Sequence, residues 1–486
     1  MRLYFRAPVI RVAVIAVLSA VFLGLAFSAE CAAMQFVSLE RYMEMVRDEN
    51  YSLKAGVKNV EAAYYDVRAS VSHQRPRISA SGSASYLTDQ ETGGAHNRNS
   101  MVYNTSIGLS HRIDISGEYT LDERQLILYY ESQRAAFENS VNTLFATAEE
   151  NYWATVLARE NIALQEDVLR QRLENNRVTE EKFKQQLVPK LDLIRSEAQV
   201  VAAESLVTEA QSQYKTLLAT LAALAGGTEV YPIGEPLIVP KYSLGAELDK
   251  AILSRPDTRS ARLALERSKV LKKLAAKGLS PTLSVTLGWT PWSEPWNSST
   301  PQKGEFGASL SLNIPIVDGN ETKYNTLNAD RLVQAAEASL MSLENTAKLE
   351  LSVALNNWDT AESLEKAKKR QVERSDEELR ITELMYNEGM GAQIDLINAQ
   401  TENQQVRTEY LNAVRGMYIA LVQLRRAVGD YAPNEEGTWK DAVVRYGKGN
   451  DVTNEMGSIK SIKARLGMTD RSEAGGKPKE SMNSKK

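Results

Sequence analysis

The spacing of hydrophobic and polar residues follows the period of an α-helix over most of this chain, and most persistently over residues 121–225. This stretch contains no glycine and a single proline, Pro189. The residues before the break, 121–183, number about 63 and would form a helix roughly 95 Å long. A proline disfavours helical backbone at the preceding residue, so we expect the chain to reverse near residues 186–189. The pattern therefore predicts a very long helical hairpin.

The returning arm of this hairpin carries the repeat of a coiled coil. Its apolar residues recur at alternating spacings of four and three residues: Leu187, Leu191, Ile194, Ala198 and Val201, and further on Ala210, Tyr214, Leu217, Leu221 and Leu224. Such a stripe is the seam along which helices pack. Another helical pattern covers residues 39–72, with Ser38 as a candidate cap and Pro76 beyond its end.

After residue 76 the period changes from 3.6 to 2, which indicates strands. In the segments near 78–86 and 103–113, apolar residues alternate with small polar ones, so each strand has one face of each kind. A hairpin packed on a soluble core would alternate in the same way, and single strands of outer-membrane barrels give weak signals. On this pair of strands alone, the soluble hairpin is the favoured interpretation.

The same order of elements returns about 203 residues later, and an internal repeat of that length defines an architecture. Pro281 corresponds to Pro76, and residues 255–257 correspond to 50–52. The order in each repeat is helix, strand, strand, long helix and returning helix. The second repeat supplies the following elements: strands near 282–289 and 306–316, a long helix over 321–386, a turn at 389–391 and a returning helix to 426. We therefore expect a first repeat over 34–242, with its helical hairpin at 121–225, and a second over 243–430, with its hairpin at 321–426.

The lengths of the helices predict how they stack. The first long helix nearly equals its returning helix, 190–225, together with a helix over 245–274. The second long helix likewise equals the helices 393–426 and 39–72 together. The irregular segments 226–243 and 431–486 would then lie where the shorter helices meet end to end, as an equatorial belt. The Gly/Ser/Lys-rich end of this tail is expected to be disordered.

Four strands cannot close a barrel, so the pattern implies oligomerisation. In a closed barrel the alternation would place the small polar residues in water and four apolar residues in lipid: Ile107, Leu109, Leu310 and Leu312.

The amino terminus has the pattern of an export signal. Three arginines precede an apolar run over 12–27, and small residues near Ala33 suit cleavage there, which makes 1–33 a signal peptide. A retained anchor is an alternative, since the run is short for a spanning helix. Lipidation of Cys31 is another, although Glu30 stands where a small residue is expected.

Composition narrows the chemistry. The chain has 486 residues, 43% of them hydrophobic, and a formal charge of −4, so a nucleic-acid partner has no electrostatic basis. One cysteine and three histidines argue against a zinc site and against Cys/His catalysis. We expect no cofactor, no metal and no enzymatic activity.

Over residues 36–430 the chain resembles the TolC-like outer-membrane channel proteins. The resemblance depends on the repeat, on Pro76 and Pro281 before strands, on Arg255–Asp257, on Asp318 and Gly319 after a strand, and on the segment 386–397. It implies a fold that is mainly α with a membrane β-barrel portion. Three chains would form a homotrimer with a 12-stranded β-barrel in the outer membrane of a Gram-negative bacterium, continuous with a periplasmic α-helical coiled-coil barrel.

The function that the resemblance implies is an exit duct of a tripartite efflux pump or a type I secretion system. Its partners would be a periplasmic adaptor (membrane fusion) protein, an inner-membrane transporter and outer-membrane lipid. Two other classes compete. A structural coiled-coil stalk or spacer of the cell envelope would explain the heptads but not the strands. An exported enzyme could use Asp192 and Asp395 as acid and base, but no nucleophile pattern accompanies them.

The resemblance also implies roles for residues near the turns of the hairpins. Asp192, Tyr386 and Asp395 would close a periplasmic gate, and six residues would form adaptor-contact tips: Gln186, Leu187, Val188, Gly389, Met390 and Gly391. The chain departs from the family where Gln186 replaces a glycine, Gly391 a gating arginine and Asn398 a second lumenal aspartate. Plainer alternatives are that the carboxylates point outward into solvent and that the glycines only permit the turn.

Overall fold

The computed structural model describes residues 35–87, 90–92, 95–97, 100–234, 254–295 and 304–431. The predicted signal peptide with Cys31, the first residues of the helix expected over 245–274, and the tail beyond residue 431 lie outside the described residues. Within them the fold is mainly helical, and no helix is both long enough and apolar enough to cross a membrane.

Two helices of equal length dominate the fold. Helix α4 (Glu118–Lys184) and helix α8 (Glu321–Asn387) have 67 residues each. Each is followed by a returning helix, α5 (Lys190–Leu224) after α4 and α9 (Gln393–Val428) after α8. The long hairpin inferred from the lack of glycine and proline thus has a counterpart in the second half of the chain.

Both hairpins reverse through a residue with left-handed backbone. In the second turn this residue is Gly389, with φ of 76°, and glycine adopts that conformation at no steric cost. In the first turn it is Gln186, with φ of 59°. A non-glycine residue there costs about 1–2 kcal/mol, so the first turn keeps the geometry of a glycine turn in spite of its sequence.

The helix expected over 39–72 is in fact two helices, α2 (Leu39–Glu49) and α3 (Tyr51–His73). The prediction of one continuous helix is therefore wrong. At Asn50 the backbone is extended, with ψ of 122°, and the buried Asn50 amide donates a hydrogen bond of 2.9 Å to the carbonyl oxygen of Leu224 at the end of α5. This contact with a distant segment favours the break over local helix propensity.

The second half of the chain has a joint of the same kind, and each joint lies within one repeat. The prediction that the helix over 190–225 meets the helix over 245–274, and that the helix over 393–426 meets the helix over 39–72, is therefore wrong, because Asn50 contacts the end of α5 and Arg255 contacts the end of α9. Arg255 precedes α7 (Pro256–Ala275), and its guanidinium donates a hydrogen bond of 3.1 Å to the carbonyl oxygen of Ala427 near the end of α9. The same guanidinium pairs with Asp257 at 2.7 Å and with Glu350 at 2.8 Å. Burial opposes the charge on Asp257, but the hydrogen bonds from Arg255 outweigh it and hold the pKa of that carboxyl below its usual value.

The strands form a four-stranded antiparallel sheet in the order β2-β5-β7-β8. Its members are β2 (Arg77–Leu87), β5 (Ser100–Ile113), β7 (Thr282–Pro295) and β8 (Glu305–Asn313). Two smaller pairs complete the described strands: β3 (Gln90–Thr92) with β4 (Ala95–Asn97), and β1 (Gln35–Val37) with β6 (Val230–Pro232).

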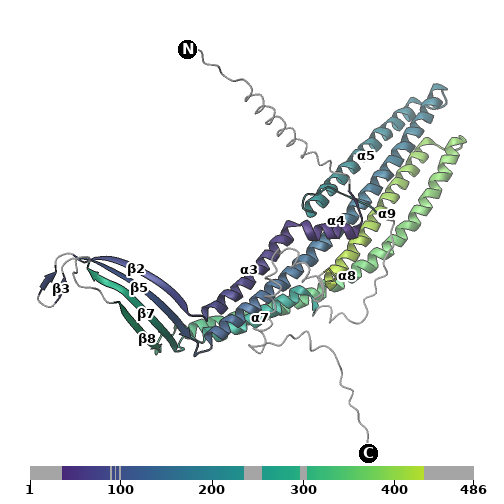
Figure 1. The fold of residues 1–486 in the computed structure, drawn as a ribbon. Helices are drawn as coiled ribbons and strands as arrows, with labels where there is room; N and C mark the ends of the chain where they lie inside the picture. Colours follow the sequence, from purple (N-terminus) through teal and green to yellow (C-terminus); the bar gives the residue numbers. More distant parts are fainter. Residues whose placement is uncertain are drawn as a thin grey trace, which may run out of the picture. The chain divides into compact units, whose positions relative to one another are not determined.

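The chain divides into two compact units, each built from three segments. The first unit has residues 1–50, 147–240 and 360–419, and so contains α5, the later parts of α4 and α8, and most of α9. The second has the remaining residues, with the sheet, α3 and α7; Figure 1 shows its four strands side by side and α3 and α7 along the starts of the long helices. An apolar core between α3 and α4, including Val57, Tyr64 and Ile127, fixes that packing.

Candidate channel surfaces and hairpin tips

The register of the sheet sorts its side chains into two faces. Leu310 is paired with Val285, Leu312 with Leu283, and Ile107 with Trp289. The residues between them pair in the same way: Ser309 with Thr286, Ser311 with Ser284, and Ser81 with Ser106, whose hydroxyl oxygens lie 2.7 Å apart. Because alternate residues of a strand point to opposite faces, one face is apolar and the other consists of small polar groups.

The apolar face is exposed in the single chain. Leu310 is 70% exposed, Leu312 57% and Ile107 45%, and Phe306 and Trp289 lie on the same face. Soluble monomers rarely expose a contiguous apolar surface of this extent. The four residues predicted to contact lipid, Leu109 among them, occupy register positions of this face. The pattern of one apolar and one small polar face is that of an outer-membrane strand.

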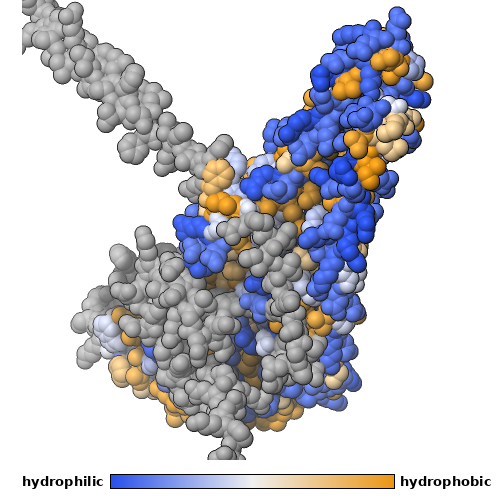
Figure 2. Space-filling model, turned by 90° about the vertical axis from the view of Figure 1, so that its right-hand side faces the viewer, coloured by the Kyte–Doolittle hydropathy of each residue, from blue (hydrophilic) through white to orange (hydrophobic). Residues whose placement is uncertain are grey.

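The returning helix α5 also exposes apolar side chains. Its buried residues are Ser196, Ala203, Ala210 and Leu221, whereas the first part of the stripe predicted as a seam is open: Leu187, Leu191, Ile194 and Val201 are each at least half exposed. On the face drawn in Figure 2, hydrophobic residues lie in separate patches along a mostly hydrophilic helical surface. This first part of the stripe therefore does not pack within its own hairpin, whereas Ala210 and Leu221 further along the stripe are buried.

The two tips are exposed turns. Leu187 is 68% and Met390 71% exposed, Gln186, Gly389 and Val188 flank them, and Gly391 donates a backbone hydrogen bond to the carbonyl of Met385. Both reversals are closed by backbone hydrogen bonds of the same kind, from Leu187 to Lys182 and from Met390 to Met385. Each turn thus presents an exposed apolar side chain, Leu187 in the first and Met390 in the second.

The three predicted gate residues have different surroundings. Tyr386 is buried, at 5% exposure, and its hydroxyl lies 3.5 Å from that of Thr179. The Asp192 carboxylate faces Arg195 on its own helix, at 3.7 Å, rather than the Tyr386 hydroxyl. Asp395 is exposed. Within one chain, Asp192 and Tyr386 are connected only through intermediate groups.

Those intermediate groups are residues that the sequence reasoning did not select. The Gln393 amide donates to the Thr179 hydroxyl and to the backbone carbonyl of Asp192, both at 3.2 Å. The Lys182 ammonium lies 4.0 Å from the centre of the Tyr386 ring and donates a hydrogen bond of 3.3 Å to its carbonyl oxygen. The sequence does contain a signal for Thr179, because this polar residue occupies a helical position at which the pattern would otherwise place a buried apolar residue.

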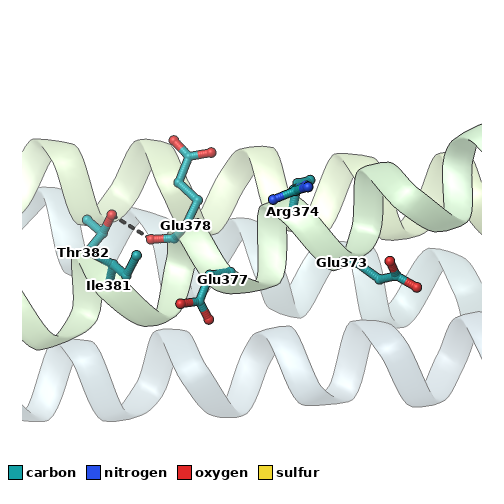
Figure 3. Close-up of a pocket in the computed structure, with 6 residues that line it drawn as sticks. All are labelled: Glu373, Arg374, Glu377, Glu378, Ile381 and Thr382. Atoms are coloured by element: carbon teal, nitrogen blue, oxygen red, sulfur yellow. Dashed lines mark hydrogen bonds between the residues drawn. The ribbon is translucent and has the colours of Figure 1, made fainter.

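A hollow on α8 is lined by Glu373, Arg374, Glu377, Glu378, Ile381 and Thr382. All six come from one helix, and Figure 3 shows their side chains projecting in different directions rather than toward one point. Glu377 pairs with Arg380 at 2.8 Å, and the Thr382 hydroxyl donates to the backbone of Glu378. We interpret this as a solvated charged helix face. Among the described residues no cluster of His, Cys, Asp or Glu could hold a metal ion.

Solved structures of outer-membrane channels have the same fold. The outer-membrane channel OprN is 20% identical, with a TM-score of 0.72 over 81% of this chain and 91% of that one. The CmeC outer membrane channel of Campylobacter jejuni is 18% identical, with a TM-score of 0.70 over 86% and 90%. These likenesses show that the fold is that of an outer-membrane channel.

Sequence comparison makes the assignment specific. Nodulation protein T of Rhizobium leguminosarum bv. viciae is 22% identical over 421 residues, which cover 83% of this chain and 85% of that protein. Outer membrane protein OprJ of Pseudomonas aeruginosa is 24% identical over 408 residues, 80% and 84%. The family model for outer membrane efflux proteins matches residues 43–227 and 248–430, and the chain belongs to that family.

Membership confirms the resemblance drawn from the sequence and the location in the outer membrane, with a helical part in the periplasm. The protein is an outer-membrane efflux channel, and the family is one of transport proteins rather than enzymes.

The two faces of β8 can be distinguished by chemical labelling. We expect a cysteine at Ser309 to react with a water-soluble, membrane-impermeant maleimide, because its face is the polar one. A cysteine at Leu310 should instead prefer a lipid-soluble maleimide. Wild-type protein, whose only cysteine is Cys31, gives the background. The reverse pattern would mean that the register is wrong by one residue, since a one-residue slip exchanges the two faces.

Proposed function

We propose that this chain forms a homotrimeric exit duct of a tripartite efflux pump or a type I secretion system, passing substrates from an inner-membrane transporter through a periplasmic adaptor to the outside. The observation that supports it most directly is the sheet, with an exposed apolar face and two open edges. In the part of the chain that the structure describes, β2 and β8 each pair on one side only.

An open sheet edge is not tolerated in lipid, because each unpaired backbone group there costs several kcal/mol. The edges of this sheet suit closure by further copies. Its four strands alternate in direction, so β8 of one copy meets β2 of the next as an antiparallel pair. Two copies would give about eight strands, a barrel whose interior side chains fill, so a duct needs at least three copies and about twelve strands.

The helices support the same assembly. The exposed stripe on α5, with Leu191, Ile194 and Val201, has the spacing of a coiled-coil seam but no partner in its own hairpin. Helix α8 likewise exposes Leu364, Ile381 and Leu384. In a closed ring, α5 of one copy would cover α8 of the next, and this contact would remove apolar surface from water in every copy.

The tips supply the surface for contact with a partner protein. A passive duct has no energy source, so substrate must arrive from a transporter that supplies one, through a protein that spans the gap between them. We assign the adaptor contact to the six tip residues, because Leu187 and Met390 are exposed apolar side chains on turns with fixed backbone. The transporter would then determine the substrate.

We assign closure of the duct to Asp192, Tyr386 and Asp395. The proposed bond joins the Tyr386 hydroxyl to the Asp192 carboxylate of a neighbouring copy. A hydrogen bond to a charged group contributes about 1.5–3 kcal/mol, so three symmetric copies of it would give roughly 5–9 kcal/mol if additive. Shifting a two-state equilibrium from 1:99 to 99:1 takes about 5.5 kcal/mol. Such a set is sufficient to hold a tip shut without an arginine at position 391. A ring of exposed Asp395 carboxylates would also attract multivalent cations.

The function is tested on the purified wild-type protein. We expect heat-modifiable trimers in outer-membrane fractions, and ion conductance when the trimers purified from them are added to planar lipid bilayers. A structural stalk or spacer would give oligomers without conductance, and hydrolysis of a broad substrate panel would instead support an exported enzyme.

The gate is tested by single-channel recording. Tyr386→Phe together with Asp192→Ala should raise the conductance, because the hydrogen bonds that close the tip are lost. Asp395→Ala should abolish block by a trivalent cation without opening the pore as far. A double variant that conducts like the wild type would place closure elsewhere along the hairpins.

The adaptor contact is tested at the second turn. Gly389→Trp should abolish export while trimers remain in the membrane, because a bulky side chain changes the exposed surface of the tip. Gly389→Asn is the matched control, since asparagine tolerates the left-handed backbone that this position requires. Normal export by the tryptophan variant would show that the glycine only permits the turn.

A further inference from the structure

The small polar face of the sheet is uncharged over most of its length. From Ser79 to Ser85 on β2, and at the matching positions of β5, β7 and β8, its side chains are those of Ser, Thr, Asn and Gly. At one level Gly108, Gly288 and Gly307 lie side by side, and a Cβ added to Gly288 or Gly307 would meet no atom within 4 Å. Packing within the chain does not require these glycines, so the wall is left open at that level.

The end of this face that is joined to the helices carries an arginine. Arg77 is the first residue of β2, four residues after the end of α3, and it pairs in register with Ser110 of β5. Since paired residues point to the same face, the Arg77 side chain lies on the polar face. It is exposed, and within the described residues no carboxylate forms an ion pair with it.

Other charged groups near this end are compensated by their surroundings. Arg112, on the same face of β5, pairs with Glu118 at 2.6 Å. The Asp114 carboxylate accepts hydrogen bonds of 2.9 and 3.0 Å from the first N–H groups of α4, and Asp318 caps α8 in the same way. The positive end of each helix dipole offsets such a carboxylate. Arg77 has no such counterpart in the part of the chain that the structure describes.

The far end of the same face carries a carboxylate. Glu305 begins β8, pairs with Thr290 of β7, and is exposed. Thr290 lies four residues from Thr286, which pairs with Ser110 and is therefore level with Arg77. At about 3.3 Å per residue, the two charged levels are roughly 13 Å apart along the wall.

A closed barrel would repeat each charge in every copy. Walls of low dielectric concentrate the field of such charges in the lumen, so they act more strongly there than on an open surface. The screening length is about 10 Å at 0.1 M salt, which is shorter than the separation of the two levels. Each level therefore keeps its own sign, with a neutral wall between them.

We propose that Arg77 determines the charge preference of the duct where the helical part opens into the barrel, and that it concentrates anionic groups of the cargo there. The matching class of substrate is a small molecule with carboxylate, phosphate or sulfate groups. Glu305 gives the outer end of the barrel the opposite preference. This inference rests on the proposed function, because it assigns a substrate class to that duct.

The charge at each level is measured with two methanethiosulfonate reagents, one anionic with a sulfonate group and one cationic with a trimethylammonium group. Ser110→Cys places the thiol beside Arg77, and Thr290→Cys places it beside Glu305. The ratio of the anionic to the cationic rate cancels the reactivity of the thiol itself. Rates are measured on full-length trimers in lipid vesicles at 0.1 M salt, with the wild type as background. The ratio should be higher at Ser110→Cys than at Thr290→Cys.

Two charge-removing variants serve as controls for each other. Arg77→Gln should lower the ratio at Ser110→Cys about two- to fivefold, the effect of one unit charge about 5–8 Å away in water, and leave Thr290→Cys unchanged. Glu305→Gln should raise the ratio at Thr290→Cys by a similar factor and leave Ser110→Cys unchanged. Arg77→Lys keeps the charge and should keep the ratio. At 1 M salt, where the screening length is about 3 Å, the ratios at the two positions should converge.

The outcomes separate this inference from the proposed function. An absence of trimers, or trimers in which Ser110→Cys reacts with neither reagent, would overturn the proposed duct, because this face would not line water. Reactive trimers whose ratio at Ser110→Cys is the same with Arg77 and with Arg77→Gln would overturn the inference and leave the duct intact. An equal change at both positions in Arg77→Gln would also overturn it, since the effect would then be one of overall charge.

Discussion

Two unbroken helices of equal length determine the arrangement of this chain. Helices α4 and α8 contain neither proline nor glycine, and each has 67 residues. Because every helical residue advances the chain by the same 1.5 Å, equal counts carry two separate hairpins the same distance from their strands to their turns. Equal lengths do not decide which shorter helices meet beside them. Asn50 and Arg255 decide it, because they donate hydrogen bonds to the backbone carbonyls of Leu224 at the end of α5 and of Ala427 near the end of α9.

Those joints and the tips use polar groups for opposite purposes. At the joint of the second half, Arg255 is matched by Asp257, Glu350 and a backbone carbonyl, so its buried charge is well paired. Toward the tips, the Arg172 guanidinium donates to the neutral side chains of Gln400 and Thr401, and two buried amide oxygens, of Asn175 and Gln393, have no hydrogen-bond partner. Well-paired buried groups specify one arrangement, while poorly paired ones are ready to be hydrated.

Periodicity predicted most of this fold. The hydrophobic period changes from 3.6 to 2 after Pro76, and the same change occurs again after Pro281. These changes located the strands, because alternation is a local property of the sequence. Local pattern could not locate the break at Asn50, since its cause is a carbonyl 174 residues away. Periodicity also predicted that the stripe at Leu191 packs against another helix, but it could not identify that helix. The tip segment identified Tyr386, but the residues that contact it, Thr179 and Lys182, come from a helix about two hundred residues earlier in the chain.

The open edges of the sheet also constrain how the protein is made. In the described residues β2 and β8 are each paired on one side only, so in the proposed trimer the association of copies comes before or during insertion into hydrocarbon. The rate of insertion then depends on a power of the concentration of exported chains, not on each chain separately. Until copies meet, the same edges are templates for wrong pairing. For the proposed trimer, biogenesis is therefore the stage most exposed to aggregation, and low synthesis rates would limit assembly more severely than for a barrel made from one chain.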